Sequence, residues 1–110
     1  LLGRVRLYQD KEFWGTAGNA RHGRLPQKPF DYYFQRLFFD TGGFGGEMSA
    51  VKAALLEMAP GQVLFGSDYP QEIRDPSLLA AYVKGIRALP LPAADIGAML
   101  GANAAGILGL

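Results

Sequence analysis

The stretch that decides the fold is Val63-Leu64-Phe65-Gly66-Ser67-Asp68-Tyr69-Pro70. It starts with a β-branched, an aliphatic and an aromatic residue, a run typical of a strand covered on both faces in a parallel sheet. Gly66 ends the run. Ligands of α/β proteins gather just past the carboxyl ends of such strands, so the pattern predicts a functional carboxylate at Asp68. Ser-Asp before Tyr-Pro is equally typical of a turn whose aspartate bonds to backbone N–H groups.

A second apolar run stands upstream and repeats the order of strand, acid and glycine. Leu37-Phe38-Phe39 is followed by Asp40-Thr41-Gly42-Gly43. Between the two runs, apolar residues from Glu47 to Ala59 recur at helical spacing, and Pro60-Gly61 ends that helix. After the second run, Asp75-Pro76 is typical of an N-cap and first helical residue, so we expect a helix to about Ala88.

This order of strand, helix, strand and helix predicts an α/β fold with two consecutive βα units of a parallel sheet. Two strands alone leave apolar edges exposed, so either partner strands lie outside this chain or another copy supplies them. The second case predicts a homo-oligomer.

The ends of the chain are less regular. Leu1 to Tyr8 is compatible with the end of a helix, residues 9–29 form a long polar connection, and residues 30–34 predict a helical turn or two. At the other end we expect two short helices, residues 93–100 and 103–108, separated by Gly101 and with Asn103 able to cap the second.

Composition excludes several classes. A net charge of +1 without interleaved basic and aromatic residues argues against nucleic-acid binding. The absence of cysteine excludes thiol chemistry and fits a cytoplasmic location. No apolar stretch approaches the roughly 20 residues that span a bilayer, so we expect neither membrane partner nor signal peptide.

Three passages resemble the amidohydrolase-related family, which includes aminocarboxymuconate-semialdehyde decarboxylase and related metal-dependent decarboxylases and hydrolases. They are residues 37–43, residues 63–70 and the final Gly101-Ala102-Asn103-Ala104-Ala105-Gly106-Ile107-Leu108-Gly109-Leu110. The resemblance implies the carboxyl-terminal portion of a TIM (β/α)₈ barrel, about its last two βα units. Residues 1–29 would be a helix end and long loop, and residues 30–110 strands seven and eight with their helices.

The resemblance also implies a site. Asp68 matches the aspartate at the end of the family's eighth strand, which binds a divalent metal, commonly zinc, and handles the proton of its bound water. The family's other ligands are histidines, whereas this chain has only His22. His22 stands in the long connection, where a surface position is favoured over a role as a ligand. The chain by itself therefore need not hold metal.

Other candidates have structural alternatives. Asp40 would pair with Asp68 as general acid and base, or simply form the turn before the next helix. Gly42–Gly46 would cradle an anion, although it matches no phosphate-binding fingerprint. Arg74 would bind a substrate carboxylate, or pair with Glu72 or Asp75 at the surface.

Two functions follow for comparison. In the first, the chain belongs to a metal-dependent enzyme that decarboxylates or hydrolyses a small carboxylated or cyclic metabolite, with Asp68 as its catalytic residue. In the alternative, the chain is a catalytically inactive, truncated half-barrel that self-associates through its exposed strand edges.

Overall fold

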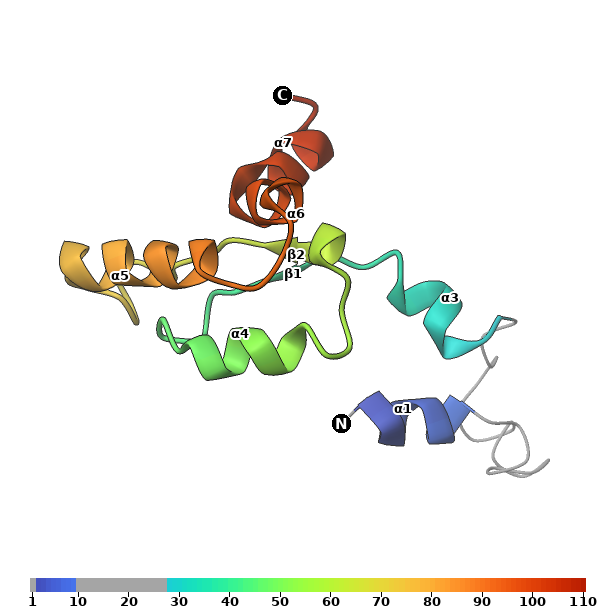
Figure 1. Ribbon diagram of the computed structural model, residues 1–110. Coiled ribbons are helices and arrows are strands. Elements are labelled where there is room, and N and C mark those ends of the chain that lie inside the picture. The colour runs from blue at the N-terminus through green and yellow to red at the C-terminus, as the bar shows by residue number, and fades with distance from the viewer. Residues whose placement is uncertain (1, 10–27) are drawn as a thin grey trace. The chain divides into compact units, whose positions relative to one another are not determined.

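The computed structural model describes residues 2–9 and 28–110 (Figure 1). It divides into two units, Leu1–Leu37 and Phe38–Leu110, which are described separately. Most of the long connection expected at residues 9–29, including His22, lies outside the described residues.

The first unit contains two short helices, α1 (Leu2–Gln9) and α3 (Phe30–Phe34). The second of these confirms the helical turn expected at residues 30–34. Arg6 Nε donates to Asp31 Oδ1 at 3.0 Å, and the Arg6 guanidinium lies 5.5 Å from the centre of the Phe30 ring. Both members of this ion pair are solvent-accessible, so it contributes little to stability.

The second unit holds one two-stranded parallel sheet surrounded by helices. In chain order its elements are β1 (Phe39–Asp40), α4 (Met48–Ala54), the 3₁₀ turn η1 (Pro60–Gln62), β2 (Val63–Leu64), α5 (Pro76–Arg87), α6 (Ala93–Gly97), the π-helical segment η2 (Ala98–Ala102) and α7 (Asn103–Leu108). The register sets Phe39 opposite Val63 and Asp40 opposite Leu64. In Figure 1, α4 lies on one side of the strands and α6 and α7 on the other.

Helix α5 begins as the sequence predicts. The Asp75 carboxylate accepts a hydrogen bond from the Ser77 N–H at 2.8 Å, and Pro76 is the first helical residue. The first backbone N–H groups of a helix have no partner within it, and the Asp75 carboxylate supplies one for Ser77. With 12 residues α5 is the longest described helix, and within the described ranges no helix is long and apolar enough to cross a membrane.

The core of the second unit lies where α4, α5 and η2 meet the sheet. Its buried side chains are Val51, Val63, Ile73, Tyr82, Ile86, Leu89 and Met99. The rings of Phe65 and Tyr82 are 5.5 Å apart, so the residue that follows β2 packs directly on α5. Each fully buried side chain of this size stabilises the fold by about 1.5–3 kcal/mol.

The carboxyl-terminal helices differ from the sequence prediction. Two helices separated at Gly101 were expected, but α6, η2 and α7 follow one another without a break, and Ala102 and Asn103 both have right-handed helical backbone angles. The π-helical segment takes up the glycine within its wider turn. Asn103 is therefore not a cap, and its side-chain amide instead donates to the main-chain oxygens of Pro60 and Val63, both at 2.9 Å.

The prediction of a portion of a (β/α)₈ barrel is wrong. Each strand has two residues, and among the described residues β2 pairs with β1 alone. A barrel requires every strand to pair on both edges. The other edge of β2 is covered by helical residues, since Phe65 N–H donates to Met99 O at 2.9 Å and Asn103 binds Val63 O. The described structure is mainly helical with one small parallel sheet, and this edge of β2 is not open to a further strand.

Candidate functional site

Asp40 is the last residue of β1, Asp68 follows the neighbouring parallel strand β2, and both lie close to Gly42. A Cβ atom added to Gly42 would lie 2.7 Å from Asp40 Oδ1 and 3.7 Å from Asp68 Cβ. Both aspartates are exposed. The parallel register thus places two carboxylates at the carboxyl-terminal end of the sheet, as the repeated sequence pattern predicts.

Thr41 fixes the geometry between the two strand ends. Its N–H donates to Leu64 O at 2.9 Å, which extends the ladder by one bond beyond β1. Its hydroxyl donates to Gly66 O at 3.0 Å and accepts from Gly66 N–H at 3.1 Å. Thr41 is only 2% exposed and Gly66 is half-buried, so this pair of bonds is partly shielded from water. Sequence reasoning missed Thr41, whose only signal is a hydroxyl between a strand-end acid and two glycines.

Tyr82, on α5, packs beneath the strand end and bonds to it. Its hydroxyl donates to Thr41 O at 3.3 Å, and its side chain is 2% exposed. Burial raises the pKa of Tyr82. Tyr82 belongs to the core, and its link to the strand end had no signal in the sequence.

Asp40 forms the turn that was the alternative to a catalytic role. Its Oδ1 accepts a hydrogen bond from the Gly42 N–H at 2.8 Å. An aspartate bonding to the backbone two residues later is a common turn arrangement. Asp40 Oδ1 is therefore already hydrogen-bonded within the turn that contains Gly42.

Asp68 has a different environment. Its φ angle is +49°, a left-handed conformation that few residues other than glycine, asparagine and aspartate adopt. Its main-chain oxygen accepts from Gln71 N–H at 2.8 Å and Glu72 N–H at 3.1 Å, so the following turn holds this backbone. Its carboxylate makes no hydrogen bond or ion pair with the described part of the chain. The side-chain bond expected from Asp68 to the backbone is made by Ser67, whose hydroxyl accepts from Tyr69 N–H at 3.4 Å.

Two other candidates are tied to their own loops. Arg74 Nε donates to Pro70 O at 3.2 Å and to Gln71 O at 3.3 Å. In the Gly42–Gly46 loop, Gly45 N–H donates to Glu72 Oε2 at 2.8 Å. A carboxylate of the chain itself thus occupies part of the proposed anion cradle, which makes this loop a structural link to the segment after β2.

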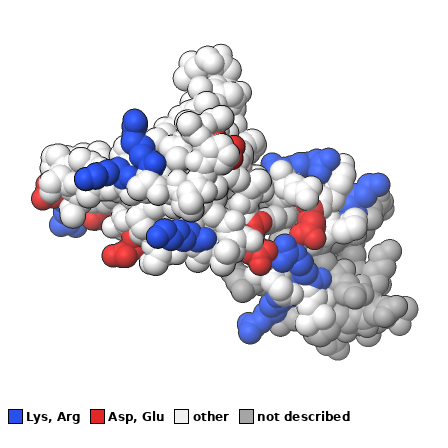
Figure 2. Space-filling model, in the orientation of Figure 1, with Lys and Arg blue, Asp and Glu red and all other residues white. Residues whose placement is uncertain are grey.

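An apolar cavity of about 250 Å³ adjoins the same strand end. It lies between the sheet and α4, and its lining residues are Phe39, Asp40, Thr41, Phe44, Val51, Ala54, Met58 and Val63. Asp40 is its only charged lining residue. On the face of the second unit that Figure 2 shows, acidic and basic side chains are interspersed.

The two aspartates do not complete a metal site by themselves. Residues 2–9 and 28–110 contain no group of three or more histidine, cysteine, aspartate or glutamate side chains that would hold a metal ion. Zinc requires three or four ligands. His22, the remaining candidate in the chain, lies outside the described residues.

Comparison of the chain with protein-family models, with curated proteins and with solved structures found no match.

Proposed function

We propose that this chain supplies the catalytic carboxylate, Asp68, of an amidohydrolase-related enzyme that decarboxylates or hydrolyses a small carboxylated or cyclic metabolite. One observation carries the proposal: the Asp68 carboxylate is exposed and has no partner in the described chain, although three main-chain and side-chain bonds hold the loop around it. Strained backbone of this kind is concentrated at functional sites. The resemblance of residues 63–70 and 101–110 supplies the enzyme class.

The metal-dependent part of this chemistry needs ligands beyond those described. A bound zinc ion would supply a water of lowered pKa. Since Asp40 and Asp68 do not complete its ligand set, we assign proton transfer to Asp68 alone, and Asp40 holds the turn at Gly42. Asp68 would accept a proton from a water or substrate hydroxyl and return it to the product.

The neighbouring residues would position that proton transfer. The two hydrogen bonds between Thr41 and Gly66 hold the strand ends together, so the backbone that carries Asp40 and Asp68 would be positioned before substrate binds. Arg74 is bound to its loop through Nε, which leaves its Nη groups as the donors for a substrate carboxylate in this proposal.

The test compares two aspartates in the natural protein that contains these residues. Turnover would be followed as CO₂ release and as hydrolysis over a panel of small aromatic carboxylates and cyclic amides. Asp68→Asn should lose at least about 100-fold in kcat, the range of a removed acid–base group. Asp40→Asn is the matched control, because the amide oxygen still accepts from Gly42 N–H, and it should keep most activity. Full turnover by Asp68→Asn would refute the role of Asp68.

A second candidate is a chain without catalysis of its own. The observation that favours it is the lack of a third metal ligand near Asp40 and Asp68 in the described residues. It is tested on the 110-residue chain by metal analysis after dialysis. Stoichiometric, tightly held zinc would contradict this candidate, whereas a metal-free and inactive chain would support it.

A further inference from the structure

Strand β1 has an outer edge that the sheet does not use. Thr41 N–H donates across the sheet to Leu64 O at 2.9 Å. Main-chain groups of successive residues point to opposite edges of a strand, so the N–H and C=O of Asp40 point away from β2. In the described part of the chain, no strand pairs with this edge and neither main-chain group of Asp40 has a hydrogen-bond partner. Such an edge is a template for another extended segment.

The apolar cavity of about 250 Å³ lies beside this edge. Paired residues of a sheet share a face, and the paired Phe39 and Val63 both line the cavity, as does Ala54 of α4. Asp40 lines it too, although its side chain points to the opposite face, where Oδ1 lies 3.1 Å from a Cβ added to Gly66. The main chain of Asp40 therefore borders the cavity.

The Asp40 carboxylate adds a negative charge to the same edge. Its Oδ1 accepts from Gly42 N–H at 2.8 Å, while Oδ2 has no partner among the residues that the structure describes, and the side chain is exposed. On an added strand, the residue directly beside Asp40 would face this carboxylate, and the residues before and after it would face the cavity. The edge thus fits a segment in which basic and apolar side chains alternate.

We infer that β1 binds an extended peptide segment of a partner protein, which adds a third strand at this outer edge. The segment bonds to the N–H and C=O of Asp40, inserts one leucine or phenylalanine side chain into the cavity and sets a lysine or arginine beside the Asp40 carboxylate. A cavity of about 150 Å³ holds benzene, so one such side chain fits in 250 Å³. Strand addition takes affinity from main-chain bonds and specificity from pockets for alternate side chains. Because β1 is short, we expect a Kd between about 10 µM and 1 mM.

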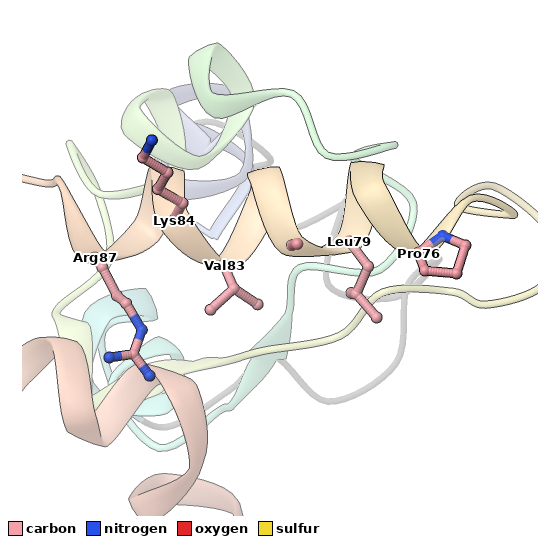
Figure 3. A pocket seen from close by; sticks show the side chains of 6 residues that line it. Pro76, Leu79, Val83, Lys84 and Arg87 are labelled. Carbon is pink, nitrogen blue, oxygen red and sulfur yellow. The ribbon is translucent and has the colours of Figure 1, made fainter.

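The larger hollow of the same unit, about 460 Å³ beside α5, lacks these features. The main-chain groups of a helix bond within the helix, so α5 presents no edge to an extended segment. The charged residues that line this hollow are Lys84 and Arg87, and Leu79 and Val83 lie between them and Pro76 (Figure 3). Because both charges are positive, a basic segment should bind at β1 and leave this hollow empty.

Peptide titration tests the site directly. The probe is acetyl-Thr-Val-Lys-Phe-Lys-Val-Thr-amide, which is added to the isotope-labelled chain of 110 residues. Saturating peptide should shift the NMR signal of the Asp40 amide and slow its hydrogen exchange at least about tenfold, because the amide gains a partner. The amides of Val83 and Lys84 in α5 should not shift. Absence of binding at about 1 mM peptide, or shifts confined to α5, would overturn the proposal.

Filling the cavity tests the insertion of the apolar side chain. Ala54→Leu extends a side chain into the cavity and should weaken binding of the probe at least about tenfold. Ala53→Leu is the matched control, because Ala53 is exposed on the same helix and does not line the cavity, and it should bind as the unmodified chain does. Should circular dichroism show that Ala54→Leu does not fold, alanine replaces phenylalanine in the probe. Equal affinity for the two peptides then refutes the insertion.

A charge change tests the contact with Asp40. Asp40→Asn keeps an oxygen that accepts from Gly42 N–H but removes the negative charge. It should bind the lysine probe about two- to fivefold less tightly, the range of an exposed cross-strand charge pair. A probe with glutamine in place of both lysines should bind both proteins equally. An equal loss for the two probes would contradict the pairing of a basic residue with Asp40.

A second copy of the chain competes for the same edge in this test. Sedimentation equilibrium compares the unmodified chain with Ala54→Leu. A dimer that Ala54→Leu dissociates would assign the edge to a second copy and overturn the peptide partner, whereas a monomer that binds the probe supports it. The surface does not depend on the proposed catalytic role of Asp68. Asp68→Asn should bind the probe normally, so a failed activity test leaves this inference standing.

Discussion

Thr41 and Gly66 exchange two hydrogen bonds between the ends of adjacent strands: the hydroxyl donates to Gly66 O at 3.0 Å and accepts from Gly66 N–H at 3.1 Å. The strands themselves have only two residues each. One side chain therefore adds two bonds to a very short ladder, at the place where Asp40 and Asp68 leave it.

Thr41→Val should destabilise the protein by about 1–3 kcal/mol, because valine has nearly the same shape but leaves the N–H and C=O of Gly66 without their partner. Thr41→Ser keeps the hydroxyl and removes one methyl group, which costs about 0.8 kcal/mol. Urea denaturation followed by circular dichroism measures both. If the serine variant lost as much stability as the valine variant, packing of the methyl group would explain the position better than its hydrogen bonds.

Gly66→Ala should also destabilise the fold, by about 1–3 kcal/mol, because overpacking forces backbone to shift. The added Cβ would lie 3.0 Å from Gly42 N and 3.1 Å from Asp40 Oδ1. Gly61→Ala is the matched control, since its Cβ would meet no atom within 4 Å, and it should be neutral or slightly stabilising. The denaturation midpoints of the two variants should separate; coinciding midpoints would mean that the loop at Gly42 adapts freely.

Local signals in the sequence predicted several parts of this structure. The Asp75-Pro76 pair is the N-cap and first residue of α5, and the helical turn at residues 30–34 is present as α3. The two strand-end aspartates do lie at one edge of a parallel sheet. The two helical features depend on backbone chemistry within a few residues, and the parallel pairing follows from the order of strand, helix and strand; a sequence displays both directly.

The residues that cover the strands were not predicted. The barrel expectation failed because a run of three apolar residues does not reveal what covers its edges, and here Met99 and Asn103 cover one edge of β2. The sequence therefore suggested association through open strand edges, although the chain itself covers one edge of β2. Asn103 shows the same limit: an asparagine near a glycine resembles a cap, and only the fold shows that its amide reaches residues 60 and 63, which are 43 and 40 positions away.

Asn103→Asp should cost more stability than Asn103→Ala. Both variants lose the two donated bonds to Pro60 O and Val63 O, a loss of about 1–3 kcal/mol. The aspartate adds a carboxylate facing two carbonyl oxygens, and like partial charges repel at such short range. Gln71→Ala is the control, since Gln71 is exposed and only its main chain takes part in the bonds described. Thermal unfolding should rank the control first, alanine next and aspartate last. An aspartate variant as stable as the alanine variant would show that α7 moves away from β2.

Ionisation of Tyr82 should lower the stability of the fold at alkaline pH. Burial raises its pKa above the ordinary 10.0, so the unfolded chain loses the phenolic proton at a lower pH than the folded chain does. The folded state then binds more protons than the unfolded state, and the free energy of unfolding falls as pH rises. The contribution of Tyr82 is therefore complete below pH 10.0 and is lost as pH rises through the raised folded-state pKa.

Tyr82→Phe isolates this effect from the other tyrosines. Near pH 8 the variant should be less stable than the unmodified chain by about 0.5–1.5 kcal/mol, because the bond to Thr41 O is lost. Towards about pH 11 the difference should shrink, since phenylalanine has no proton to lose. Urea midpoints across this range measure the difference. A constant gap would mean that ionisation of Tyr82 is the same in the folded and unfolded chains, and that its burial serves packing alone.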